Sequence, residues 1–304
     1  EQIARFAVNQ YKYPSLDVRP YFKRNYLYGE AMTHILGYVG RINDRDVERL
    51  KKEEKFANYS GSTDMGKLGI ERYYEEQLHG TTGFEEVEIN NRGKVIRKLR
   101  EQPATAGKSI HLTIDLALQR YIMALLSGQK GAVVVLDPKD NSVLAMVSTP
   151  SYDNNLFVDG ISSSDYKRLL EDPTRPLYSR ATQGVYPPAS TVKPFVAVAA
   201  LTEGVITPNT TIFDPGYWTL PNSTKRFRDW KKTGHGYTDL NKAITESSDT
   251  FFYQTAFNLG IDRFSMWMKR FGFGMPTGIE IQEEATANMP SKEWKQKRYK
   301  KPWV

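Results

Sequence analysis

Ser190 and Lys193 stand three residues apart, after two prolines and at the start of the apolar segment 194–201. Prolines end the structure before them, so the serine is expected near a helix N-terminus, with the lysine one turn along the same face. A serine hydroxyl becomes a nucleophile only when a base takes its proton, and a buried lysine can be that base. The pattern predicts a Ser–Lys nucleophile; the alternative is a helix cap followed by a solvated lysine.

A second polar pair, Ser247 and Asp249, stands two residues apart on a predicted turn ahead of the apolar helical segment 250–257. Both residue types cap helices well, so a plain N-cap is one interpretation of the pair. The other interpretation is a polar group that works with Ser190 and Lys193. Ser247 follows Lys193 by 54 residues. The segment 208–237 between the two pairs is predicted to be a long polar and aromatic loop.

The elements that must position these residues begin at Gly107, where the composition changes. The pattern predicts a strand over 111–115, a helix over 116–126, and two strands over 131–138 and 143–148. The last two are predicted to pair as antiparallel strands, and two antiparallel strands with a helix on one face favour an α/β sandwich core built round a mixed sheet.

The first third of the chain is polar, basic and irregular. It is predicted to hold a short apolar element at 31–39, a charged helix at 44–57, an amphipathic helix with glycine stops over 66–83, and a β-hairpin over 85–99. His34 lies in the apolar element and is interpreted as a core or interface histidine. The domain boundary is placed near 103–109.

Composition limits the possible functions. The chain has 304 residues, which favours two domains, and a net charge of +7, which favours an anionic lipid or polymer as partner. No nucleic-acid-binding signature is present, so nucleic acid is excluded as the main partner. The chain has no cysteine, which excludes disulfides and thiol chemistry. No apolar run approaches the roughly 20 residues that cross a bilayer.

The two polar pairs and two glycine signatures resemble those of the class B penicillin-binding proteins. The signatures are Gly-x-x-Gly-Ile-Glu over 66–71 and Leu-x-Gly-x-x-Gly over 78–83. The resemblance covers essentially the whole chain and is greatest to the elongation-type members of Gram-negative bacteria. It implies an α+β protein with an irregular pedestal (dimerisation-type) domain over 1–106 and a transpeptidase domain over 107–304, a mixed sheet with helices on its faces.

The resemblance implies a D,D-transpeptidase of peptidoglycan synthesis and gives each residue a role. Ser190 would attack the penultimate D-Ala carbonyl of a stem peptide and form an acyl-enzyme, which the amine of a neighbouring stem resolves into a cross-link. Lys193 would deprotonate Ser190, and Ser247 would relay protons. Asp249 stands where many relatives carry Asn. β-Lactams would acylate the same serine, and no cofactor is required.

The family's third motif, Lys-Ser/Thr-Gly on an edge strand, is not matched. Lys232-Thr233-Gly234 lies before Ser247, outside any strand-like pattern, and is interpreted as a chance match. The transpeptidase domain is therefore expected to be C-terminally incomplete, and the chain alone is expected to show little turnover.

The loop 208–237 also holds possible metal ligands: Asp214, Asp229 and His235. Two carboxylates and an imidazole suit zinc, and in similar proteins a cysteine between the Ser and Asp of the second motif completes the site. Here that residue is Ser248, a poor zinc ligand. The alternative is that Asp214 makes a turn, Asp229 pairs with a neighbouring arginine, and His235 ends the loop.

Two other functions stay open: a hydrolase of β-lactams or D-Ala-D-Ala peptides, and a non-catalytic cell-wall scaffold. The resemblance also implies partners and a location. A rod-shape glycosyltransferase and morphogenesis proteins would contact the pedestal, and the protein would lie in the periplasm, anchored to the inner membrane by a helix before Glu1.

Overall fold

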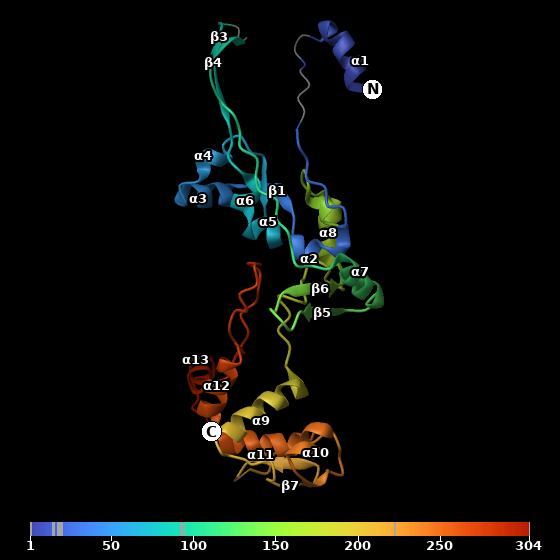
Figure 1. Ribbon diagram of the computed structural model, residues 1–304, viewed down its shortest axis with the longest axis vertical. Helices are drawn as coiled ribbons and strands as arrows, with labels where there is room; N and C mark the ends of the chain where they lie inside the picture. Colours follow the sequence, from blue (N-terminus) through green and yellow to red (C-terminus); the bar gives the residue numbers. More distant parts are fainter. Residues whose placement is uncertain are drawn as a thin grey trace. The chain divides into compact units, whose positions relative to one another are not determined.

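The computed structural model describes residues 2–13, 16, 21–91, 93, 95–221 and 223–303. The predicted domain ends at Glu1 and Val304 lie outside these residues. The chain forms two compact units, coloured by sequence in Figure 1. Unit 1 comprises residues 1–181 and 280–283; unit 2 comprises residues 182–279 and 284–304.

Unit 1 contains helices and short strands in alternation. Its helices, with 3₁₀ helices marked η, are α1 (Gln2–Asn9), η1 (Gln10–Lys12), η2 (Gly29–Ala31), α2 (Thr33–Leu36), α3 (Asp44–Lys52), α4 (Phe56–Tyr59), α5 (Gly69–Tyr73), α6 (Glu75–His79), α7 (Leu116–Leu125), η3 (Asn154–Phe157) and α8 (Ser163–Glu171). Its strands are β1 (Val39–Arg41), β2 (Asp64–Gly66), β3 (Phe84–Ile89), β4 (Val95–Gln102), β5 (Gly131–Leu136) and β6 (Val143–Thr149).

Unit 2 is mainly helical, with four short strands in its polar loop. Its helices are η4 (Ala189–Val192), α9 (Lys193–Thr202), α10 (Leu240–Thr245), α11 (Asp249–Leu259), α12 (Ile261–Arg270) and α13 (Lys292–Tyr299). Its strands are β7 (Ile212–Asp214), β8 (Tyr217–Thr219), β9 (Arg226–Arg228) and β10 (Gly236–Thr238).

All five sheets formed by the described residues are antiparallel pairs: β1–β2, β3–β4, β5–β6, β7–β10 and β8–β9. The α+β class is confirmed, but the predicted mixed sheet is wrong for this part of the chain. The predicted antiparallel pairing is confirmed as β5–β6, which the short connection 137–142 joins as a hairpin, and no third strand among the described residues adds to it. The predicted packing of the helix over 116–126 on these strands is confirmed, because Ile122 of α7 contacts Ala145 and Val147 of β6.

The predicted strand over 111–115 is also wrong. This segment reaches β6 through the Asp115 N–H to the Leu144 carbonyl, 2.8 Å, and the Thr113 hydroxyl to the Val143 carbonyl, 2.7 Å. One of these contacts uses a side chain, so no backbone ladder forms. Asp115 instead caps α7 by accepting a hydrogen bond from Leu118 N.

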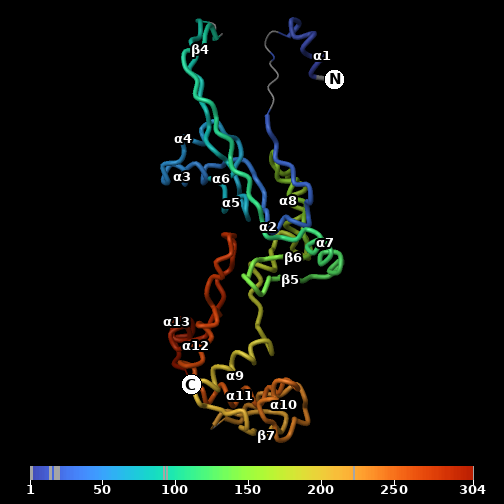
Figure 2. The backbone as a smooth tube through the Cα atoms, viewed as in Figure 1, coloured from blue at the N-terminus to red at the C-terminus, as the bar shows by residue number. Residues whose placement is uncertain are grey.

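The pedestal helices are shorter than predicted. The helix over 44–57 is split into α3 and α4 where Glu54 has a φ of 59°, and the helix over 66–83 is split into α5 and α6. The predicted hairpin is confirmed as β3–β4, whose two strands run side by side in Figures 1 and 2.

The glycine signature of the pedestal holds a buried ion pair. Glu71 of α5 is buried and accepts two charge-assisted hydrogen bonds from the Arg24 guanidinium, at 2.8 and 2.9 Å, and one from the Tyr26 hydroxyl. Gly69 has a φ of 59°, and a Cβ there would lie 2.5 Å from the Ile35 carbonyl oxygen, so only glycine fits. The signature is thus explained by close packing.

His34 packs in the core, as predicted, but its Nε2 is buried without a hydrogen-bond partner among the described residues. Its ring packs edge-on against Tyr152 with centroids 5.6 Å apart. Burial lowers the pKa of His34 to about 4, so the ring is neutral at physiological pH. A neutral, packed imidazole has a structural role here.

The core of unit 2 lies between α9, α11 and α12. Val196, Ala197 and Ala200 of α9 pack against Phe251 and Phe252 of α11, with Met268 of α12 completing the cluster. The small side chains of α9 let the helices approach closely. This core fixes the helix that starts at Lys193 against the helix that starts at Asp249.

Candidate active site

Lys193 lies on the buried face of α9. The buried positions of this helix include 193, 196, 197 and 200, which is the spacing of one helical face. The lysine is 7% exposed, and its ammonium lies 5.7 Å from the centre of the Phe252 ring. The alternative of a solvated lysine is therefore wrong.

Ser190 lies in the 3₁₀ turn η4, which leads directly into α9. The preceding residue, Ala189, has a φ of 49°, a conformation that non-glycine residues rarely adopt. This sharp turn leaves Ser190 exposed. An exposed serine at the N-terminus of a helix is accessible to a substrate.

Ser247 lies where α10 ends. Its N–H donates to the Ile244 carbonyl (3.3 Å) and the next N–H, of Ser248, donates to the Ala243 carbonyl (3.0 Å), which is the Schellman pattern of a helix C-terminus. Ser247 has a φ of 56°, in the position that usually carries glycine. A serine kept in a glycine position at some conformational cost indicates that its hydroxyl has a function.

Hydrogen bonds connect the three predicted residues in one chain. The Ser247 hydroxyl donates to Ser190 Oγ at 3.0 Å, and Lys193 Nζ donates to Ser247 Oγ at 3.1 Å and to the Ser247 carbonyl at 2.8 Å. Among the described residues, no direct hydrogen bond joins Ser190 to Lys193. A proton leaving Ser190 can therefore reach the amine through the Ser247 hydroxyl.

Asp249 completes the group with an ion pair to Lys193, 2.6 Å between Oδ1 and Nζ. Its second oxygen, Oδ2, accepts from the Trp230 backbone N–H at 3.3 Å. The carboxylate thus uses both oxygens as acceptors, one toward the ammonium and one toward the loop. The sequence did not predict this ion pair. The N-cap of α11 is Ser248, the residue between Ser247 and Asp249, so neither member of the predicted pair caps the helix.

Trp230 is a residue of the site that sequence reasoning missed. Its indole N–H donates to the Glu246 carbonyl at 3.0 Å, and its backbone N–H donates to Asp249. Both its side chain and its backbone therefore bond to the segment 246–249 that carries Ser247. The side chain is nevertheless 64% exposed. Nothing in the sequence marks it, because its place depends on how the loop 208–237 folds.

The predicted metal ligands do come together, in a buried cluster beneath the second-motif turn. His235 Nδ1 lies 2.6 Å from Asp214 Oδ2, and the Ser248 hydroxyl lies 3.0 Å from the same oxygen and 3.3 Å from Asp229 Oδ2. Asp229 Oδ2 also accepts from the Thr250 N–H at 2.9 Å. The two carboxylates therefore hold Ser248 and Thr250, the residues on either side of Asp249.

The alternative interpretation of this loop is half right. Asp214 does make a turn, because its Oδ1 accepts from the Gly216 N–H at 2.7 Å. Burial would raise the pKa of Asp214, but the hydrogen bonds from His235 and Gly216 outweigh it and lower the pKa to about 2. Asp229 is buried within the cluster, and no described arginine forms an ion pair with it.

The donor set falls one ligand short of a structural zinc site. The ligand atoms of Asp214, Asp229 and His235 lie within 4.8 Å of one another. Structural zinc takes four protein ligands, and the fourth place is occupied by Ser248, a neutral hydroxyl that is fully buried. Its single proton can go to only one of the two carboxylates at a time, and His235 Nε2 is buried without a hydrogen-bond partner among the described residues. The carboxylates are nevertheless held by the backbone N–H groups of Gly216 and Thr250. The residues present fit a hydrogen-bonded clamp better than a metal centre.

Lys232 and Thr233 lie in a turn, and Gly234 has a φ of 73°. A Cβ at Gly234 would lie 2.1 Å from the Asp214 carbonyl oxygen. The tripeptide 232–234 therefore packs its glycine against Asp214 in the loop 208–237, and it is not a strand, as predicted.

Comparisons with known proteins show the family. A family model described as "Penicillin binding protein transpeptidase domain" matches residues 131–301, and one described as "Penicillin-binding Protein dimerisation domain" matches residues 1–112. The chain is 84% identical over 304 residues to a protein of Haemophilus influenzae named peptidoglycan D,D-transpeptidase MrdA, covering all of this chain and 47% of the relative. It is 64% identical over 302 residues to the protein of that name in Escherichia coli K12, covering 99% and 48%.

Solved structures are similar as well. A complex of Helicobacter pylori PBP2 with MreC has a TM-score of 0.86 at 32% identity, covering 99% of this chain and 56% of that one. Pseudomonas aeruginosa PBP2 in complex with WCK 5153 has a TM-score of 0.79 at 45% identity, covering 95% and 59%. The chain spans about half the length of the curated relatives it matches. Each helix in the described ranges is too short or too polar to cross a bilayer.

Proposed function

Since this chain belongs to the class B penicillin-binding proteins, with a dimerisation and a transpeptidase domain, we propose that it acts as a peptidoglycan D,D-transpeptidase through an acyl-enzyme on Ser190. The observation that carries the proposal is the hydrogen-bond chain from Ser190 through Ser247 to Lys193. Such a relay is what an unactivated serine needs before it can attack a carbonyl. Penicillin-binding transpeptidases need no cofactor.

The steps follow from the contacts. The Ser190 proton passes to Ser247 Oγ while the Ser247 proton passes to Lys193 Nζ, and Ser190 Oγ bonds to the carbonyl carbon of the penultimate D-Ala. The Ser190 backbone N–H would donate to the oxyanion. The same relay returns a proton to the leaving D-Ala amine as the peptide bond breaks. A second amine then attacks the ester, gives up its proton, and releases the serine.

Asp249 supports this transfer by stabilising the ammonium that forms on Lys193. Asp249 Oδ1 lies 2.6 Å from Lys193 Nζ, which is where a carboxylate stabilises that ammonium. The carboxylate holds the amine beside the Ser247 hydroxyl, so the relay is ready for the return of the proton to the leaving group. In this chain Asp249 fills the positioning role with both oxygens, Oδ1 toward Lys193 and Oδ2 toward the Trp230 N–H.

Product analysis tests the proposed reaction. The protein at its natural length is incubated with a pentapeptide donor ending in D-Ala-D-Ala and an amine acceptor, and the products are identified by mass spectrometry. A cross-linked product with released D-Ala is expected. If tetrapeptide from hydrolysis were the sole product, the result would favour a hydrolase function. If the donor stayed unchanged, the result would favour a non-catalytic scaffold.

Replacing Asp249 by asparagine is expected to slow acylation by a β-lactam about tenfold, because one hydrogen bond to a charged group is worth about 1.5–3 kcal/mol and only part of it is lost. The amide has one acceptor oxygen, so either Lys193 or the Trp230 N–H loses its partner. The rate is measured by stopped-flow with a chromogenic β-lactam. An unchanged rate in Asp249→Asn would show that the second acceptor is not needed.

We propose that the buried cluster holds the second-motif turn without zinc. Protein purified without chelator is expected to contain well under one zinc ion per chain. Ser248→Cys adds the missing thiolate beside Asp214, Asp229 and His235, so its zinc content should rise toward one ion per chain. Elemental analysis of both proteins decides the question. Stoichiometric zinc in the unaltered protein would contradict the proposal.

The remaining expectations are proposals of the same kind. We place the boundary between pedestal and transpeptidase domains at 106/107, although α7 and β5–β6 pack with unit 1 through Gln119, whose side chain donates to the Ala31 carbonyl at 2.9 Å. The H. pylori complex with MreC supports a morphogenesis protein as partner. We also propose a rod-shape glycosyltransferase as partner and a periplasmic location with an inner-membrane anchor.

A further inference from the structure

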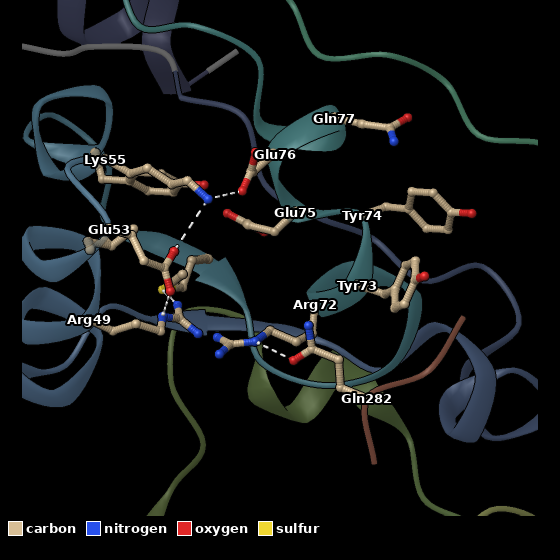
Figure 3. A pocket seen from close by; sticks show the side chains of 13 residues that line it. Arg49, Glu53, Lys55, Arg72, Tyr73, Tyr74, Glu75, Glu76, Gln77 and Gln282 are labelled. Atoms are coloured by element: carbon tan, nitrogen blue, oxygen red, sulfur yellow. Dashed lines mark hydrogen bonds and ion pairs between the residues drawn. The ribbon is translucent and has the colours of Figure 1, made fainter. Parts of the chain in front are cut away.

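Unit 1 contains a cavity of about 470 Å³ that shares no residue with the active site. Its walls come from α3, α4, β2, α5 and α6, with Gln282 at one edge (Figure 3). A volume of this size is within the usual range of small-molecule sites, which is about 300–1,000 Å³. The cavity carries charged side chains of both signs, and their pairing is uneven.

Arg49, on α3, is poorly satisfied. Its Nε is buried and makes no hydrogen bond with any described residue. Its contacts with carboxylates are long, 3.8 Å to Asp46 and 3.9 Å to Glu53, and one terminal nitrogen faces the Met65 sulfur at 3.5 Å, a weak acceptor. A buried donor without a partner is uncommon and calls for an explanation.

Arg72, on α5, brings a second guanidinium to the same place. It donates Nε to the Gln282 side-chain oxygen at 3.2 Å, and no carboxylate among the described residues pairs with it. Figure 3 shows its terminal nitrogens pointing toward the guanidinium of Arg49. Two like charges that face one another repel unless an anion lies between them.

The acidic residues of the cavity already have partners. Glu53 and Glu76 both pair with Lys55, and Glu75 accepts a hydrogen bond from the Gly66 N–H at 2.7 Å. These carboxylates therefore leave the facing guanidinium groups without a strong acceptor. The cavity wall carries three basic and three acidic side chains, so the uneven placing of the carboxylates, and not an excess of positive charge, leaves the guanidinium groups of Arg49 and Arg72 without a close acceptor.

We propose that Arg49 and Arg72 form a binding site for an oxyanion, the carboxylate or phosphate group of a small ligand. A planar guanidinium binds either group through two parallel hydrogen bonds, which would satisfy the buried Nε of Arg49 and remove the repulsion. The rest of the cavity, lined by Tyr59, Tyr73 and Tyr74, takes the body of the ligand. The site is independent of the proposed function.

Titration with inorganic phosphate, followed by the ³¹P NMR linewidth, tests the site at constant ionic strength. Saturable binding at one site is expected for the protein at its natural length, and it should persist after β-lactam acylation. Arg72→Gln is expected to weaken it at least about tenfold, the loss of one charge-assisted hydrogen bond. Arg45→Gln, an exposed arginine on the same helix α3, is the matched control and should leave it unchanged.

Arg72→Lys keeps the charge without the planar fork and should give an intermediate affinity, which separates recognition from misfolding. Competition by acetate identifies the ligand group: displacement at similar concentrations indicates a carboxylate ligand, and resistance indicates a phosphate. Absence of saturable binding would overturn the proposal. Equal affinities in Arg72→Gln, Arg45→Gln and the unaltered protein would overturn it as well.

Discussion

Replacing Ser190 by alanine is expected to abolish covalent labelling by a fluorescent penicillin, because the hydroxyl oxygen is the atom that forms the ester. Ser247 lies 3.0 Å away but cannot substitute for it. Its hydroxyl is held in a left-handed turn behind the nucleophile and is committed to Lys193. Removing a catalytic serine costs on the order of 10⁶ in rate in a well-studied serine protease, and a loss of comparable size is expected here.

Thr191→Ala is the control for this experiment. Thr191 is exposed, and its hydroxyl bonds only to the Pro188 carbonyl within the same turn, so labelling should persist. Labelling of Ser190→Ala at an undiminished rate would mean that another nucleophile reacts. Circular dichroism of both variants excludes loss of fold as the cause, since the Ser190 side chain is exposed and contributes little to packing.

Replacing Lys193 by arginine is the second prediction with a large effect. Arginine keeps the positive charge and can retain the ion pair with Asp249, but it does not give up its proton in proteins. It therefore cannot take the proton that leaves Ser190 through Ser247. The acylation rate constant is expected to fall by about 10²–10⁴, the usual contribution of a general base.

Lys193→Met provides the comparison. It keeps much of the volume against Phe252 and removes the charge, which leaves Asp249 without its ammonium partner. This variant is expected to lose both acylation and thermal stability, whereas Lys193→Arg should lose mainly acylation. Stopped-flow acylation and thermal melts separate the two effects. A rate for Lys193→Arg within tenfold of the unaltered protein would contradict a base role.

The sequence was informative about the nucleophile for a physical reason. The spacing of Ser190 and Lys193 is a property of one helix, and the apolar positions of α9 place the lysine on the buried face. The convergence of Asp214, Asp229 and His235 was expected from their residue types in one loop and from the resemblance to proteins that hold zinc there. What could not be predicted was the order of contacts, in which Ser247 stands between the nucleophile and the amine.

Long-range pairing explains the errors. The segment 111–115 has a strand-like pattern, yet it contacts β6 through only one backbone and one side-chain hydrogen bond among the described residues, and Asp115 caps α7. The mixed sheet was inferred from strands whose neighbours are decided by tertiary contacts, and each described strand pairs in an antiparallel way. Trp230 contacts Asp249 from a separate loop, and Arg49 and Arg72 come from two different helices. Their contacts depend on the tertiary fold, so no local sequence pattern predicts them.

Peptide mapping of the protein after exposure to a β-lactam tests the central claim most directly. Intact-mass spectrometry first gives the number of adducts, and fragmentation of the modified peptide then gives the residue. A single adduct on Ser190, absent from Ser190→Ala and formed slowly in Lys193→Arg, is the predicted result. An adduct on any other residue, or none on the folded protein, would contradict the account.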